Sequence, residues 1–256
     1  APRAAEEQAE ILRIASSEAT PGITFRPLQR RFLTIPQSPL CYWLRERFFE
    51  LLAGKTLGDV ASVCQGLATA NDARFVRFTW EAPPAEWAQE VRKRRWVPFE
   101  KGGGYGKWFG HHFWVVDWQD SGARIKQTPG PRVQNEQHYF KAGWTYSYMA
   151  RGSLGVRELL PCGIFAAGAS AGIVLTDPGL EAPVATFLNC RLASYIIRSV
   201  SSKVQLNESY VGRIPLVRTT ESSLLSIETA CETMKRHFIS MQITERSYFP
   251  REAAEH

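Results

Sequence analysis

The sequence has no hydrophobic run long enough to cross a membrane, because none of its apolar segments approaches the ~20 residues that a spanning helix needs. Cysteine is also scarce: there are five in 256 residues, and no two are spaced as a CxxC pair. An odd number without paired spacing favours free thiols in a reducing compartment over a disulfide framework. The acidic, alanine-rich N-terminus lacks the apolar core of a secretory signal. These absences predict a cytoplasmic chain with no membrane partner.

Sequence motifs for catalysis are missing as well. Amino-methyltransferases use an Asn/Asp-Pro-Pro-aromatic loop to hold the amino group of a base, but the only Pro-Pro pair here, Pro83-Pro84, stands between two alanines. No G-x-S-x-G elbow marks a nucleophilic serine, and the sequence leaves Ser/His/Asp or Cys/His arrangements open. The adjacent pair His111-His112 cannot face a single ion. We expect no catalytic residue, no metal and no cofactor in this chain.

The glycine-rich segment from Lys101 to Lys107 differs from a nucleotide-binding loop at two decisive positions. A P-loop requires glycine at position 101 and serine or threonine at position 108, whereas the chain has Lys101 and Trp108. The segment that follows, 113–118, is strand-like, so no helix N-terminus is available to hold a phosphate. Two interpretations remain: a glycine-rich hairpin between two strands, or a hairpin tip that contacts nucleic acid.

What the sequence does have is an ordinary globular composition, with 44% hydrophobic and 22% charged residues. A chain of this length buries enough surface to fold without disulfides. The net charge is +6, and ten Lys/Arg stand against five Asp/Glu between Gln89 and Lys141. Six of the eight tryptophans lie between Trp80 and Trp118. A basic segment rich in aromatics suits a polyanion-binding face, although a solvated charged surface is an equally good reading of the charge alone.

Hydrophobic periodicity predicts an α+β fold rich in β-structure. Helices are expected at 38–53, 84–94, 183–198 and 219–242. Strands are expected at 57–63, 75–80, 96–99, 113–118 and 139–148, with a buried strand pair at 164–175. The predicted organisation is a linker or the end of a preceding domain at 1–24, a domain at 25–218, a C-terminal helix at 219–245 and a tail at 246–256.

The C-terminal helix carries apolar residues at alternating spacings of three and four, which is an a/d seam. Its members are Leu224, Ile227, Cys231, Met234, Phe238 and Met241. The seam is shorter than three heptads, which favours docking on another helix over a free coiled coil. The N-terminal segment around Ile11 and Ile14, or the same helix of a second molecule, would cover it. The second arrangement would make a dimer.

Four segments together resemble a known family. They are IPQSPLCYW (35–43), QGLATANDARF (65–75), FEKGGG with KWFG and VVDW (99–118), and RVQNE with YFKAGWT (132–145). In this order and spacing they resemble the C-terminal portion of the PglX-like adenine methyltransferases of BREX and phage-growth-limitation systems, and of their DISARM-type relatives. The resemblance covers about residues 25–218. Segments 187–192 and 205–216 are similar to the end of a type I specificity-subunit recognition domain, in which a spacer helix follows, here 219–242.

The resemblance implies a β-rich DNA target recognition domain of the type I specificity-subunit or TaqI-like kind, with flanking helices and a spacer-like C-terminal helix. The implied partners are duplex DNA, a methyltransferase catalytic domain in the same or another chain, and other phage-defence proteins. S-adenosylmethionine is implied for the parent enzyme only. The family usually has glycine where Ala70 stands, a basic residue at Gly106 and asparagine at His111.

The candidate DNA-contacting residues come from two loops and a third segment. They are Asn71, Asp72 and Arg74 in the first loop, Lys101, Tyr105, Lys107 and Trp108 in the second, and Arg132, Asn135 and Lys141 in the third. For Trp108 a core position is the main alternative, and for the last three it is solvated surface. The rival function is a protein-interaction module that assembles a defence complex; a complete small enzyme is disfavoured by the missing motifs.

Overall fold

The computed structural model describes residues 6, 9, 10, 13, 28–35, 41–83, 94–149, 153–201, 205–216 and 220–241. The chain forms two compact units, Ala1–Ala53 and Gly54–His256. The predicted boundaries at 24 and 218 stay predictions. Among the described residues, none of the helices combines the length and the apolar character that crossing a bilayer demands.

The first unit contains the 3₁₀-helix η1 (Gln29–Thr34) and the helix α2 (Glu46–Leu52). Phe32 packs against Phe49 with ring centroids 6.0 Å apart. The helix predicted at 38–53 begins only at Glu46 in the described part. Cys41 to Leu44 form a turn instead, in which the Leu44 N–H donates to the Cys41 carbonyl. The predicted cap at 38–39 lies outside the described residues.

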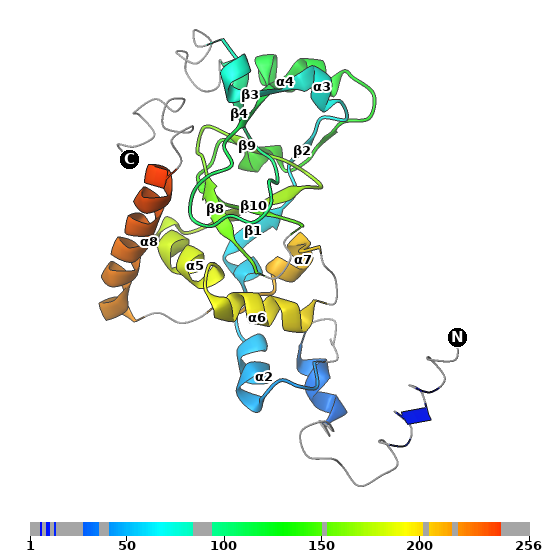
Figure 1. Ribbon diagram of the computed structural model, residues 1–256, viewed down its shortest axis with the longest axis vertical. Helices are drawn as coiled ribbons and strands as arrows, with labels where there is room; N and C mark the ends of the chain where they lie inside the picture. Colours follow the sequence, from blue (N-terminus) through cyan, green and yellow to red (C-terminus); the bar gives the residue numbers. More distant parts are fainter. Residues whose placement is uncertain are drawn as a thin grey trace. The chain divides into compact units, whose positions relative to one another are not determined.

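The second unit contains two four-stranded sheets (Figure 1). One sheet has the order β1 (Ala61–Cys64), β10 (Ser170–Leu175), β7 (Gly143–Ser147) and β8 (Val156–Leu159), all antiparallel. The other has the order β3 (Val76–Phe78), β5 (Trp114–Asp117), β4 (Trp96–Glu100) and β9 (Ile164–Phe165), in which only β4 and β9 are parallel. A short antiparallel pair joins β2 (Leu67–Ala68) to β6 (Arg132–Val133).

The sheets and helices confirm the predicted mixed α+β class, and strands at 96–99 and 113–118 lie where the sequence placed them. Two details differ. The strand expected at 57–63 begins only at Ala61, because the 3₁₀-helix η2 (Leu57–Asp59) is capped by Asp59, which accepts a 2.7 Å hydrogen bond from the Thr56 N–H. The two strands within 164–175 are buried as expected, but they belong to different sheets and do not pair with each other.

The helices of this unit pack against both sheets, and Phe75 and Ile125, on two of them, belong to the core around the second sheet. These helices are α3 (Asp72–Phe75), α4 (Gln119–Lys126), α5 (Glu181–Leu188), α6 (Arg191–Val200), α7 (Glu208–Val211) and α8 (Glu221–Met241). Three further 3₁₀-helices are η3 (Thr79–Glu81), η6 (Glu136–His138) and η7 (Pro178–Leu180). The helix expected at 84–94 falls almost wholly on residues that the structure does not describe.

The single helix expected at 183–198 is two helices, α5 and α6, interrupted at Asn189. The buried Asn189 side chain accepts from the Val156 N–H at 2.9 Å and donates to the Val156 carbonyl at 3.0 Å. After it, Cys190 takes an extended conformation and its sulfur accepts from the Ala193 N–H, which caps α6. A polar side chain bonded to the strand β8 therefore ends one helix and starts the next.

Two hydrophobic clusters form the core of this unit. One lies between the first sheet and helices α5, α6 and α7, and includes Tyr146, Ile173, Leu188, Ile197 and Val211. The other lies around the second sheet. Its members include Phe75, Val97, Val116, Ile125 and Phe165. Because β2, β4, β5 and β6, which border the candidate segments, all contribute residues to this second cluster, it helps to set the positions of the candidate residues.

Helix α8 docks on α5 of the same chain, beside which it lies in Figure 1. Cys231 is buried and Phe238 is partly buried against the first cluster, and the Lys235 ammonium lies 2.7 Å from a Glu158 carboxylate oxygen. The prediction that this helix docks on another helix is confirmed, because α5 covers part of the seam. Ile11 and Ile14 lie outside the described residues, and the dimer stays a prediction.

Candidate nucleic-acid interface

The first candidate loop connects β2 to α3. Ala70 has a φ of 57°, in the left-handed region that favours glycine, which explains why glycine suits this position. Asn71 caps α3 because its side-chain oxygen accepts a 3.1 Å hydrogen bond from the Arg74 N–H. Arg74 is exposed, and its guanidinium lies 5.0 Å from the centroid of the Phe75 ring. The loop therefore presents Arg74 on a turn with a defined geometry.

An ion pair joins this loop to the second one. The Lys101 ammonium lies 2.5 Å from one carboxylate oxygen of Asp72, and the Thr69 hydroxyl donates to the other oxygen at 2.5 Å. Burial alone would raise the pKa of Asp72, but the hydrogen bonds from Lys101 and Thr69 outweigh it and lower the pKa. The two loops that the sequence predicted separately therefore meet, and Asp72 stays ionised at neutral pH.

The second loop, residues 101–112, is anchored from below by Arg157. This guanidinium is fully buried and donates to the Lys101 carbonyl at 3.0 Å and to the Ser147 hydroxyl at 3.3 Å. The same hydroxyl oxygen accepts from the Gly103 N–H at 3.2 Å. A buried cation on β8 and a hydroxyl on β7 thus fix the start of a loop that contains five glycines.

The middle of the loop is held by its backbone. The Trp108 N–H donates to the Val156 carbonyl at 2.7 Å, and the Glu158 N–H donates to the Trp108 carbonyl at 2.9 Å. The Trp108 side chain is 8% exposed and packs in the first cluster. The structure therefore favours the core alternative for Trp108. Strands β4 and β5, which the loop connects, pair antiparallel as the hairpin interpretation required.

His111 fills the space between two of the glycines. A Cβ atom built on Gly103 would lie 2.6 Å from its Nδ1, and one on Gly106 would lie 2.7 Å from its Nε2. Burial, followed by the nearby Arg157 charge, lowers the pKa of His111. Its neighbour His112 is buried and pairs through Nδ1 with a Glu100 oxygen at 2.5 Å. No group of three or more His, Cys, Asp or Glu that could hold a metal occurs among the described side chains.

Tyr105 and Lys107 lie just before Trp108 in the second loop. Tyr105 is 52% exposed, and the Lys107 ammonium lies 5.9 Å from its ring centroid. That ammonium also donates to the Asn189 carbonyl, so Lys107 binds the α5–α6 junction. Its predicted role as a phosphate contact has to compete with this bond.

The third candidate segment divides between support and surface. The Asn135 side chain donates to the Gln65 carbonyl at 2.9 Å from a left-handed backbone position, so it fixes the entry to β2. Arg132 is exposed on β6, opposite Ala68, and Lys141 is exposed after η6. Within the part of the chain that the structure describes, Arg74, Arg132 and Lys141 form no ion pair with a carboxylate.

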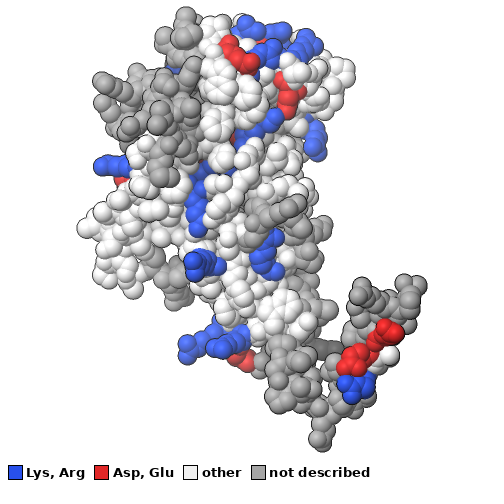
Figure 2. All heavy atoms as spheres, in the orientation of Figure 1, with Lys and Arg blue, Asp and Glu red and all other residues white. Residues whose placement is uncertain are grey.

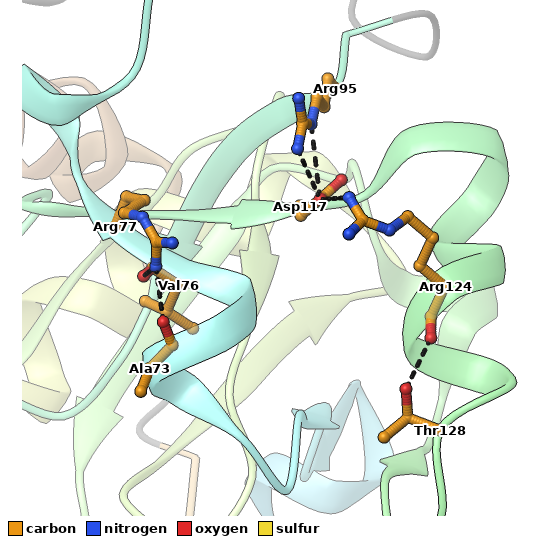
Figure 3. A network of polar contacts seen from close by, with 7 residues as sticks. All are labelled: Ala73, Val76, Arg77, Arg95, Asp117, Arg124 and Thr128. Atoms are coloured by element: carbon orange, nitrogen blue, oxygen red, sulfur yellow. Dashed lines mark hydrogen bonds and ion pairs between the residues drawn. The ribbon is translucent and has the colours of Figure 1, made fainter.

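Further arginines gather at the same end of the unit. The carboxylate of Asp117, 2% exposed, accepts from Arg95 at 3.3 Å and from Arg124 at 2.8 Å (Figure 3). Arg77 donates to the carbonyls of Ala73 and Val76. Figure 2 shows Lys and Arg atoms gathered over the end that carries α3, β3 and α4, and continuing over the middle of the face, with fewer acidic atoms among them.

The supporting residues were missed from the sequence. Glu100 ends the apolar strand WVPFE, and Arg157 stands beside Glu158 in the strand VREL. Glu100 and Arg157 are both fully buried. A charge in a short, otherwise apolar strand is the signal that would have found Glu100, because a buried charge needs partners. The same holds for Asp117 at the end of β5. No such signal marks Arg157.

Comparison with known proteins places these features in context. No family model matches the chain. It is 25% identical over 209 residues to the adenine-specific methyltransferase PglX of Lacticaseibacillus casei (strain Zhang), which covers 76% of this chain and 17% of that protein. It is 27% identical over 177 residues to the adenine-specific methyltransferase BrxX of Escherichia coli O9:H4 (strain HS), covering 68% of this chain and 14% of that protein. The chain thus spans less than a fifth of the length of these relatives. The resemblance predicted from the four sequence segments is confirmed: the chain is a relative of the PglX and BrxX adenine-specific methyltransferases.

Proposed function

We propose that this chain is the duplex-DNA recognition part of an adenine-specific methyltransferase of a BREX-type phage-defence system. The observation that carries the proposal is the Lys101–Asp72 ion pair, because it brings two loops of the family-like segments to one basic surface. In the parent protein, a catalytic domain in the same or another chain would transfer the methyl group from S-adenosylmethionine.

The arrangement suits the division of labour in DNA recognition, in which phosphate contacts position a protein and base contacts supply specificity. Arg74, Arg132 and Lys141 are exposed cations without carboxylate partners in the described structure, so we assign them to phosphates. Asn71 and Asp72 offer polar groups at the tip of the first loop. Lys107 and Asn135 support the loops through their bonds to backbone carbonyls.

Salt-dependent binding to duplex DNA tests the proposal. Each cation that neutralises a phosphate contributes about −0.9 to the slope of log K against log[salt], so three contacts give about −2.7. Replacing Arg74, Arg132 or Lys141 by alanine should flatten the slope by about 0.9 each. Arg236→Ala is the matched control, because it removes the same charge from an ion pair on α8.

The outcomes separate this function from its rival. Absence of duplex binding at low salt, or slopes that none of the three substitutions changes, would contradict DNA recognition and favour the protein-interaction module. Calorimetric titration with S-adenosylmethionine should detect no binding to this chain, since the cofactor and catalytic motifs are missing from its sequence. Micromolar affinity there would overturn the assignment of catalysis to another domain.

A further inference from the structure

Three aromatic rings form a column beside the Asp72–Lys101 pair. Trp80 stacks on Phe78 with ring centroids 4.5 Å apart and planes 6° apart, and Phe78 stacks on Trp114 at 4.1 Å and 24°. The Lys101 ammonium lies 5.1 Å from the Trp114 ring centroid. The column thus has Trp80 at one end and a cation beside the ring at the other.

The Trp80 end of the column is open. Trp80 is 52% exposed although Phe78 covers one of its faces, so its exposed area includes the opposite face. An exposed indole ring at the end of an aromatic stack offers a flat apolar surface that water solvates poorly.

The backbone that carries Trp80 is fixed. In η3, the Glu81 carboxylate accepts from the Phe78 N–H at 2.8 Å. The neighbouring Thr79 is buried, and its N–H donates to the Phe113 carbonyl at 2.9 Å. A ring held in this way loses little freedom when another ring stacks on it.

Charged groups surround the column. A hollow beside it is lined by Asp72, Arg77, Glu81 and Lys101 together with the rings of Phe78 and Trp114. Both acids are already engaged, Asp72 by Lys101 and Glu81 by a backbone N–H. The Arg77 guanidinium is oriented by two carbonyls (Figure 3). A ligand with a flat aromatic part and a nearby anionic part matches these surroundings.

We propose that the open face of Trp80 stacks an unpaired nucleobase of bound DNA, and that the backbone of the same strand continues along the column past Arg77 toward Lys101. Bases inside a duplex have both faces covered by their neighbours, so only an unpaired base has a face to offer. Stacking on aromatic side chains tolerates any base sequence. The inference rests on the proposed function and deepens it, because it assigns this surface to a strand that is locally opened.

The test compares three short DNAs with this chain: a fully paired duplex, the same duplex with one unpaired central adenine, and the single strand. Stacking one base on an aromatic side chain typically changes affinity by about tenfold or more. We therefore expect the duplex with the unpaired base to bind about tenfold more tightly than the paired duplex.

Variants assign the difference to Trp80. Trp80→Ala should abolish the preference for the unpaired base while leaving affinity for the paired duplex unchanged, and Trp80→Phe should retain part of it. Trp43→Ala is the control, since Trp43 is an exposed tryptophan of the first unit. Melting curves of each variant establish that it is folded.

Each outcome is informative. Equal affinity of the chain for paired and unpaired duplexes overturns the stacking site but leaves duplex recognition standing. Binding to the single strand or to the unpaired base without binding to the paired duplex keeps the stacking site and overturns the proposed function. Loss of affinity for all three DNAs in Trp80→Ala, with melting unchanged, overturns the stacking site because the side chain would then act on the paired duplex. No binding of any DNA overturns both.

Discussion

The two candidate loops are held in place in different ways. The first, residues 69–74, is stabilised by contacts that span three residues of sequence, from Asn71 to the Arg74 N–H and from Thr69 to Asp72. The second, residues 101–112, is held by side chains and backbone from distant strands and helices, above all Arg157. The first loop is held mainly by local contacts, to which the Lys101–Asp72 pair adds a distant one. The second is anchored on the core, although Tyr105 is exposed.

This difference indicates which loop tolerates changes of its side chains. Exposed local hydrogen bonds contribute little to stability, so the first loop can change its side chains at small cost. Removing a buried guanidinium leaves its hydrogen-bond acceptors without a donor, which lowers the free energy of unfolding substantially. We therefore expect the second loop to act as a rigid reference against which the first loop is placed. Four changes test this comparison.

The largest effect is expected from Arg157→Met, which keeps most of the side-chain volume but removes the cation beneath the second loop. The free energy of unfolding should fall by about 3 kcal/mol, because the Lys101 carbonyl and the Ser147 hydroxyl lose a charged donor. Urea denaturation measures this. Arg124→Met, at an exposed guanidinium bound to Asp117, should cost under ~1 kcal/mol. Similar losses for both variants would contradict the comparison.

A smaller effect of opposite sign is expected from Ala70→Gly in the first loop. Ala70 has a φ of 57°, which costs a residue with a Cβ about 1–2 kcal/mol, and the added freedom of glycine in the unfolded chain offsets part of the gain. The variant should be about 0.5–1 kcal/mol more stable by urea denaturation. Ala68→Gly, in the neighbouring strand β2, should be destabilising instead. Destabilisation by both would show that strain at Ala70 is not relieved.

The pH dependence of stability sharpens the comparison further. The pKa of His111 is lowered from 6.5 by burial and by Arg157. Below pH 6.5, His111 binds a proton in the unfolded chain but not in the folded chain. The free energy of unfolding therefore decreases as the pH falls from 6.5 toward the lowered pKa of the folded state. Melting temperatures should drop between about pH 7.5 and about pH 5.5, and His111→Gln should reduce the drop. His237→Gln, at an exposed position on α8, should leave it unchanged. An equal drop in the wild type and His111→Gln would remove His111 as a cause.

The smallest effect on stability is expected from Asp72→Asn. The Asp72 side chain is 53% exposed, so losing its ion pair should change the free energy of unfolding by under ~0.5 kcal/mol. Binding should change more, because Lys101 is released from its carboxylate and one negative charge leaves the surface. Duplex affinity at low salt is expected to rise several-fold. A fall in affinity would mean that the Asp72 carboxylate itself contacts a base.

The sequence predicted what depends on local pattern. Strand β5 follows from its aromatic and β-branched residues, and the α+β class follows from such strands together with the helical spacing near the C-terminus. The resemblance identified both loops, although their meeting through Lys101 and Asp72 needed the fold, because 29 residues separate them. The hydrophobic periodicity does not predict that Asn189 ends a helix by bonding to β8, or that α8 packs against α5, because both depend on contacts between distant segments.

The outer edge of β8 has a consequence for contacts between copies of the chain. As an edge strand, β8 would present unpaired N–H and carbonyl groups to other strands. Asn189 takes both backbone groups of Val156, and Trp108 occupies the Val156 carbonyl and the Glu158 N–H. The sheet therefore cannot be extended on this side by a strand of a second molecule. Such closure limits edge-to-edge aggregation between copies of the chain.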